Sequence, residues 1–304
     1  MGSRGEVIIL LNAGAGARGN VRQSAKDQIQ AALTDAGLDA EVRPVRGRNI
    51  TAAAKTAVDE KPRLIVAAGG DGTASAVAGA IAGTNIRLGV IPLGTLNHFA
   101  KDCGIPTKIP DAVHTLRRGS VRTVDVATVN DVLFLNNVSI GAYPSVVRRR
   151  EVRRAGFGWG KWSAMAWALM SISRRYPVVR VDLDFEGRRE PVQSPFLFVG
   201  NNRYDLRLLR LGARQRLDGG ELCVYFSNDS NRREIARMLW RSAIGKLSQD
   251  QDFRMVHPLR ITVRSQRRRI RVAVDGEVRR LESPLQFESR PRALKVMVPK
   301  AVPR

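Results

Sequence analysis

In the stretch Arg63-Leu-Ile-Val-Ala-Ala-Gly-Gly-Asp-Gly-Thr-Ala-Ser75, a short apolar run leads into a glycine-rich turn. Residues 64–68 are typical of a buried strand in a parallel sheet. Residues 74–82 predict a helix, and Thr73 is placed to cap its first turn. The turn between strand and helix carries three glycines around one carboxylate, namely Gly69, Gly70, Asp71 and Gly72.

The glycine-rich turn has the properties of a phosphate-binding site. Glycine lets the backbone approach a ligand closely, and the first amides of the following helix have no partner within that helix. Open α/β sheets bind nucleotides at such turns, where a strand ends. Asp71 would repel bare phosphates, but it suits a site in which a divalent cation lies between carboxylate and phosphate. The alternative is a structural turn in which Asp71 bonds the next amides.

Two short motifs resemble signatures of one family. Gly69-Gly-Asp-Gly-Thr73 resembles the signature of the diacylglycerol kinase catalytic-domain family, which includes bacterial soluble lipid kinases and sphingosine and ceramide kinases. NAD kinases and phosphofructokinases carry a related motif, so this one alone does not choose among them. Pro92-Leu-Gly-Thr-Leu-Asn97 closely resembles the second lipid-kinase signature. The resemblance implies nucleotide binding at Gly69, Gly70, Asp71, Gly72, Thr73, Gly94, Thr95 and Asn97.

Pattern alone favours a helix-capping role for Thr95. The position after Asn97 holds His98, where the family has an aspartate that belongs to a carboxylate and water network near the metal. This chain therefore departs from the family at that position.

The first loop also bears on the nucleotide site. Asn12 opens a loop with three glycines that follows the first apolar strand, residues 7–11. The loop fits the dinucleotide pattern G-x-G-x-x-G, which leaves NADP binding open. It also resembles the first loop of the kinase family, which implies that Asn12 contacts the nucleotide.

Composition limits the class of protein. A chain of 304 residues can bury two separate cores. No apolar run approaches the ~20 residues that a membrane span needs, and the start of the chain lacks a signal-peptide pattern. Cys103 and Cys223 are its only cysteines, which excludes a disulfide framework. We therefore expect a cytoplasmic protein.

The formal net charge of +23 indicates an anionic partner. We expect no specific nucleic acid, because no zinc-finger or aromatic RNA-recognition motif is present. A membrane surface with acidic phospholipids is favoured if the substrate is a lipid; a chain that is basic throughout is the alternative. Residues 148–176 place arginines and tryptophans around a short apolar run, which fits an interfacial membrane segment or a buried helix. A homodimer is left open.

Beyond residue 128 the pattern changes from alternating strands and helices to successive strands with hairpin turns, which predicts an antiparallel β-sandwich. We expect an α/β fold with a nucleotide-binding domain over residues 1–128 and a lipid-substrate sandwich domain over residues 129–290. The resemblance implies that the first domain is like those of NAD kinase and phosphofructokinase, and that residues 291–304 return toward it. Expected strands of the second domain are residues 132–137, 178–185, 196–200, 221–227, 259–263, 269–274 and 278–281. Expected helices are residues 21–36, 50–58, 111–118 and 231–246.

The remaining acidic candidates rest on the resemblance. On pattern alone, Val274-Asp-Gly-Glu277 is a hairpin turn. In the family its first acid is the proposed base that removes the proton of the lipid hydroxyl, which implies Asp275 as base. Glu277 would then serve orientation or metal support. The metal ligands implied by the resemblance are Asp71 and Asp125 for one Mg²⁺ and Asp218 for a structural Mg²⁺.

Together these features predict an ATP-dependent lipid kinase that transfers the γ-phosphate to a lipid hydroxyl, with ATP and Mg²⁺ as cofactors. The candidate catalytic residues are Asp71, Asp275 and Glu277. Peripheral association with a membrane is expected. Two alternatives stay open: a kinase of a soluble substrate such as an NAD kinase, and a non-catalytic sensor of lipid or nucleotide. The sequence does not choose among diacylglycerol, phosphatidylglycerol, a sphingoid base and ceramide.

Overall fold

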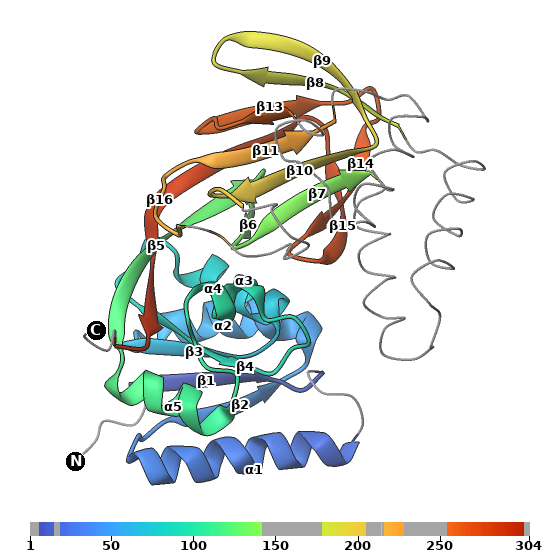
Figure 1. The fold of residues 1–304 in the computed structure, drawn as a ribbon. Coiled ribbons are helices and arrows are strands. Elements are labelled where there is room, and N and C mark those ends of the chain that lie inside the picture. Colours follow the sequence, from blue (N-terminus) through green and yellow to red (C-terminus); the bar gives the residue numbers. More distant parts are fainter. Residues whose placement is uncertain are drawn as a thin grey trace, which may run out of the picture.

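The computed structural model describes residues 6–14, 19–141, 178–204, 214, 216–227 and 254–300, with only the backbone for residues 19–24. These residues form an α/β domain and a β-sandwich domain, one above the other in Figure 1. The expectations for residues 148–176 and 231–246 lie outside the described residues. Within the described part, no helix combines the length and the apolar character needed to cross a membrane.

A parallel sheet forms the centre of the α/β domain. Its strands β2 (Glu41–Val45), β1 (Val7–Asn12), β3 (Leu64–Gly69) and β4 (Arg87–Pro92) lie side by side in this order. Residues 7–11 and 64–68 are all buried, because helices cover both faces of the sheet.

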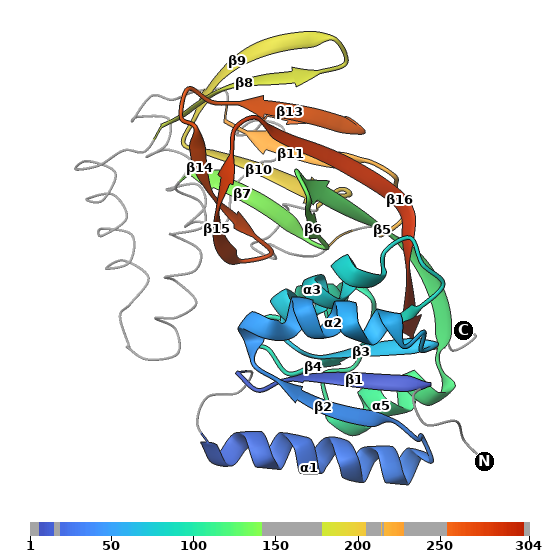
Figure 2. The same ribbon diagram turned by 180° about the vertical axis from the view of Figure 1, so that it is seen from behind.

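The helices of the α/β domain fall into two layers. One face of the sheet carries α1 (Gly19–Ala36) and α5 (Ile109–Arg118). The other face carries α2 (Ile50–Asp59), α3 (Asp71–Ile81) and α4 (His98–Asp102), preceded by the short 3₁₀ helix η1 (Gly47–Asn49). Figures 1 and 2 show that α3 and α4 lie on the side of the sheet that faces the sandwich. Both signature turns lead into these two helices.

The sandwich domain consists of two antiparallel layers around one apolar core. The first layer is a sheet with the order β12 (Arg254–Val256), β11 (Leu222–Phe226), β10 (Phe196–Asn201), β7 (Asn137–Gly141), β14 (Arg269–Val274) and β15 (Glu277–Glu282). The second contains β5 (Ser120–Val129), β6 (Val132–Phe134), β8 (Val179–Phe185), β9 (Arg188–Ser194), β13 (Arg260–Arg264) and part of β16 (Leu285–Val298). Phe134, Phe226 and Phe287 are buried between the layers.

Strand β16 joins the two domains. It pairs antiparallel with β13 in the sandwich, parallel with β4 in the α/β domain, and antiparallel with β5 along most of its length. Its register shifts between Arg290 and Leu294, and Arg292 there has a left-handed φ of +54°. Main-chain hydrogen bonds therefore connect the domains, and β16 starts six residues before the return segment expected from residue 291 (285 against 291).

The predicted fold class is confirmed: an α/β domain is followed by an antiparallel sandwich. Two local expectations are wrong. Residues 132–137 form two strands and not one, because Leu135 and Asn136 leave the ladder and turn their amides toward the carboxylate of Asp275, in the turn after β14. Strand β9 was missed because it is rich in charge and contains Pro191; it lies at the edge of its sheet, where a proline is tolerated.

Candidate functional site

The signature turn is built differently from the expectation. Gly70 is the N-cap of α3, so the helix begins at Asp71 and Thr73 lies inside the first turn. The expected capping role of Thr73 is therefore wrong. Its Oγ1 accepts a hydrogen bond from Asn12 Nδ2 at 2.9 Å, which ties the first loop to the signature turn. Gly69 has no room for a side chain, because a Cβ there would overlap Thr73.

The two glycine turns pack backbone against backbone. A Cβ on Gly94 would lie 2.5 Å from the Cα of Gly70 and 2.8 Å from Asn97 Oδ1. Asn97 has a φ of +50°, and its side chain bonds the Gly94 amide at 3.0 Å and the Gly94 carbonyl at 2.7 Å. Thr95 is exposed and does not cap α4, which begins at His98. Close packing explains these glycines, and their contact with phosphate stays a prediction.

Asp71 acts across elements. Its carboxylate accepts hydrogen bonds from the amides of His98 at 3.1 Å and Phe99 at 3.0 Å, which satisfies the first turn of α4. The alternative of a structural Asx turn, in which Asp71 would accept the next amides of its own turn, therefore names the wrong hydrogen-bond donors. The backbone of His98 contributes to this contact although its side chain differs from the family's aspartate. Asn136 Nδ2 lies 3.5 Å from Asp71 Oδ1.

Asp275 stands at the turn between β14 and β15 and accepts four hydrogen bonds. Oδ1 receives the amides of Asn136 at 2.8 Å and Asn137 at 3.0 Å. Oδ2 receives the amide of Leu135 at 2.9 Å and the hydroxyl of Ser75 at 2.5 Å. Ser75 belongs to α3, so this contact crosses between the domains. Burial raises the pKa of the Asp275 carboxyl, whereas the four donors act to lower it.

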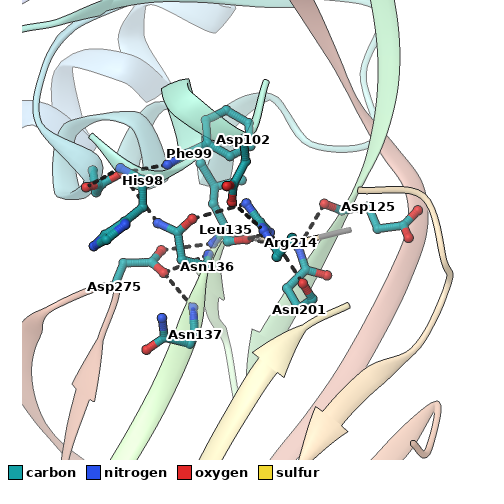
Figure 3. Close-up of polar contacts among 11 residues, drawn as sticks. His98, Phe99, Asp102, Asp125, Leu135, Asn136, Asn137, Asn201, Arg214 and Asp275 are labelled. Atoms are coloured by element: carbon teal, nitrogen blue, oxygen red, sulfur yellow. Dashed lines mark hydrogen bonds and ion pairs between the residues drawn. The ribbon is translucent and has the colours of Figure 1, made fainter. Parts of the chain in front are cut away.

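Asn136 connects the two aspartates. Its backbone amide donates to Asp275 and its side-chain amide faces Asp71, and the residue is only 2% exposed. Figure 3 shows Asp275, Asn136 and His98 grouped where the β-strands of the sandwich meet the helices of the α/β domain. The carboxylates of Asp71 and Asp275, which come from different domains, therefore both face Asn136.

Glu277 lies over the same helix start. A Cβ on Gly72 would overlap the Glu277 carboxylate, so the first residue of β15 rests on the first turn of α3. Glu277 is exposed and forms an ion pair with Arg279 at 3.2 Å. Gly72 therefore allows the hairpin of the sandwich to approach the signature turn.

Arg214 is a site residue that the sequence did not reveal. Its buried guanidinium donates to Asp102 Oδ2 at 2.8 Å, to the Leu135 carbonyl at 2.6 Å and to Asn136 Oδ1 at 3.2 Å. In the sequence it is one of 51 lysines and arginines, so nothing sets it apart. One signal for Asn136 is a pair of asparagines inside an apolar segment, Phe134-Leu-Asn-Asn-Val138.

The predicted metal ligands Asp125 and Asp218 each have partners within the protein. Asp125 is buried, and its oxygens accept the amides of Gly220 and Arg292, both at 2.7 Å. In Figure 3 its carboxylate points away from Asp275 and Asn136. Asp218 is exposed and pairs with Arg216 at 3.3 Å.

Across the described ranges no three histidine, cysteine, aspartate or glutamate side chains cluster as a metal site. The expected holding of Mg²⁺ by Asp71 and Asp125, directly or through water, stays a prediction: each carboxylate accepts two backbone amides here, and lone-pair sites are left on both. We derive no step through the ion.

Comparison with known proteins identifies the family. The model of the diacylglycerol kinase catalytic domain matches residues 6–129, and that of the YegS C-terminal NAD kinase beta sandwich-like domain matches residues 136–298. The chain belongs to the diacylglycerol kinase-like family of lipid kinases. The two models of this family meet near residues 129–136, close to the boundary predicted at residue 128.

Two bacterial proteins illustrate the similarity to known relatives. A protein of Citrobacter koseri named "Probable lipid kinase YegS-like" is 33% identical over 71% of this chain and 70% of its own length. A Pectobacterium atrosepticum protein of the same name is 33% identical over 49% of this chain. The chain spans about half the length of the first relatives it matches, 56% and 53% for two of them, so their names alone assign it no activity.

Solved structures support the fold. A structure described as a diacylglycerol kinase from Bacillus anthracis str. Sterne matches with a TM-score of 0.67 at 22% identity, over 96% of both chains. A second B. anthracis structure gives a TM-score of 0.72 at 23% identity, over 96% of this chain and 97% of the other. At this identity the likeness shows the two-domain fold.

Proposed function

We propose that this protein transfers the γ-phosphate of ATP to the hydroxyl group of a lipid. The observation that carries the proposal is the meeting of Asp71 and Asp275 at Asn136. One acid follows the strand that leads into the glycine turn, and the other belongs to the hairpin of the second domain. Membership of a family whose members are named as kinases supports phosphoryl transfer.

The acceptor hydroxyl would give its proton to Asp275. A carboxylate offers about four lone-pair sites, and four donors occupy those of Asp275. Three donors are backbone amides, which are fixed. The Ser75 hydroxyl can turn, since its Oγ also lies 3.0 Å from the carbonyl of Asp71. When Ser75 donates there, Oδ2 of Asp275 is released for the lipid hydroxyl.

The chemical step transfers one phosphoryl group and one proton. The lipid oxygen forms a bond to the γ-phosphorus, its proton passes to Asp275 Oδ2, and the bond from the γ-phosphorus to the β–γ bridging oxygen breaks, releasing ADP. Placement of donor and acceptor supplies most of the rate in phosphoryl transfer. We assign the nucleotide to the edge where Asn12, the turn Gly69–Thr73 and Gly94 meet, since these elements contact one another there.

The lipid is proposed to enter from a membrane surface. The net charge of +23 supports attraction to acidic phospholipids, and it predicts that the attraction weakens as salt rises. The lipid alcohol would approach Asp275 from the sandwich domain. An NAD-kinase-like activity and a sensor without activity are the competing functions.

One incubation separates these functions. The purified chain is mixed with ATP labelled in the γ-phosphate, with and without Mg²⁺, and with vesicles of acidic phospholipid that carry one lipid alcohol each; NAD is offered in parallel. We expect label in a lipid phosphate, in amounts that fall as salt is raised. Label in NADP would assign a soluble acceptor. Binding of vesicles or nucleotide with no labelled product would assign a sensor, and either result contradicts the proposal.

A further inference from the structure

We propose that Arg214 is a positioning residue of the phosphoryl-transfer site, acting through the side chain of Asn136. This inference rests on the function proposed above. Arg214 touches neither Asp71 nor Asp275 in any contact that the structure shows, but it holds the residue that lies between them.

The first argument is the burial of the charge. The Arg214 side chain is 0% exposed, and the side chain of its partner Asp102, the last residue of α4, is 6% exposed. Burial works against the charged form, but Tyr204 and Asp102 raise the pKa of Arg214, so the guanidinium stays charged. A buried charge is tolerated only when it is paired with an opposite charge and its N–H groups are hydrogen-bonded. Arg214 therefore has one well-defined orientation.

The second argument is what that orientation does. The guanidinium binds the carbonyl of Leu135 at 2.6 Å and that of Asn201 at 3.3 Å, and it stacks over the Tyr204 ring with 5.7 Å from Cζ to the centroid. The amide of Leu135 in turn donates to Asp275. Arg214 thus fixes the backbone segment that supplies three of the four donors to the proposed base.

The third argument is the polarity of the Asn136 amide. Arginine has donors only, so the Asn136 atom that faces Arg214 at 3.2 Å must be the oxygen Oδ1. The amide nitrogen Nδ2 must then face Asp71, as the contact at 3.5 Å shows. Without Arg214 the amide could turn over and present its oxygen to the Asp71 carboxylate, which would repel it. Arg214 therefore lets one asparagine present N–H groups to both acids.

A purely structural role predicts a different pattern of effects. The ion pair with Asp102 joins the segment before β11 to α4. Loss of a buried ion pair lowers the stability of a protein wherever the pair lies, so a fall in stability alone does not indicate a positioning role. A positioning role requires in addition that the effect of Arg214 on turnover depends on Asn136. A double-mutant cycle separates the two roles.

The cycle uses wild type, Arg214→Lys, Asn136→Ala and the double variant, with kcat, the KM for ATP and the unfolding midpoint measured in each. Lysine keeps a positive charge beside Asp102 but lacks the planar guanidinium group, which donates hydrogen bonds in several fixed directions. We expect Arg214→Lys to lower kcat about 10- to 100-fold, as misplaced reacting groups do, with KM for ATP changed less than about threefold. The double variant should be no slower than Asn136→Ala alone.

Two further variants control for stability. Arg203→Lys makes the same chemical change at an exposed arginine of the sandwich, which forms an ion pair with Glu221. This variant is expected to leave kcat unchanged. Asp102→Asn weakens the anchor but leaves Asn136 in place, so the unfolding midpoint should fall while kcat falls less than in Arg214→Lys.

The outcomes are distinct. Full turnover in Arg214→Lys, losses that multiply in the double variant, or a loss of kcat that disappears when the assay is cooled well below the unfolding midpoint would each overturn the positioning role. A wild-type chain that labels no lipid would instead overturn the proposed function. In that case the same double-mutant cycle is evaluated on the unfolding midpoints. Additive effects of Arg214→Lys and Asn136→Ala on the midpoint would contradict an interaction between the two residues.

Discussion

Replacing Asp275 with asparagine is expected to lower the turnover of lipid phosphorylation by about three orders of magnitude, within the range typical of a lost general base. Asparagine has no oxygen that can take up the proton of the acceptor hydroxyl. Its NH₂ group would also face a backbone amide at one of the two positions that now accept hydrogen bonds. Turnover with labelled ATP and the best lipid of the panel measures the effect.

The same exchange should reduce stability, by about 1–3 kcal/mol for the opposed donors. Circular dichroism and the unfolding midpoint must therefore show that the variant is folded at the assay temperature. Asp131→Asn makes the same chemical change at an exposed turn of the sandwich and serves as control. Near-normal turnover in a folded Asp275→Asn protein would show that the base lies elsewhere.

The pH dependence follows from the raised pKa of Asp275. The base must be ionised, so kcat/KM should rise with pH through a pKa above the usual range of an aspartate. Because the folded state holds this proton more tightly than the unfolded chain, the carboxyl stabilises the fold below its unfolded pKa, and this contribution is lost as pH rises through the folded pKa. Both dependences should be absent in Asp275→Asn.

Introducing alanine at Gly94 is expected to separate the two glycine turns. The added Cβ would lie 2.5 Å from the Cα of Gly70, and neither backbone can move without parting the ends of β3 and β4. We expect a cost of about 3 kcal/mol, the upper part of the range for overpacking, together with loss of nucleotide binding. Chemical unfolding and titration with ATP measure the two effects.

Gly79→Ala is the matched control for this prediction. Gly79 lies within α3, and a Cβ there would sit 3.7 Å from Leu133 Cβ, an ordinary van der Waals contact. Alanine in a helix is favoured over glycine by roughly 0.5–1 kcal/mol, so this variant should be as stable as wild type or more so. Equal stability of the Gly94 and Gly79 variants would refute the packing account of the signature glycines.

Local chemistry allowed much of this to be predicted. Apolar runs of residues 7–11 and 64–68 gave buried parallel strands, and Asp275-Gly276 gave the hairpin between β14 and β15. The wrong expectations concern partners that are distant in sequence. Asp71 accepts the amides of His98 and Phe99, 27 and 28 residues away, which makes a local cap of α4 at Thr95 unnecessary. Thr73 lies inside α3 and accepts a hydrogen bond from Asn12, 61 residues away.

The residues that sequence reasoning missed act through tertiary contacts. Asn136 meets Asp71 across 65 positions, and Arg214 meets Asn136 across 78. Neither local pattern identifies a site residue by itself, because an asparagine beside a strand and an arginine in a basic chain are ordinary features. Their significance arises only when β16 and β5 hold the two domains against each other.

The most direct test of a single site shared by both domains is a crystal structure of the protein with a non-hydrolysable ATP analogue. We predict that the γ-phosphate lies between the turn Gly69–Thr73 and Asp275, with Asn136 still bridging Asp71 and Asp275. A nucleotide bound away from this junction, or a complex in which the two carboxylates no longer share Asn136, would contradict the account.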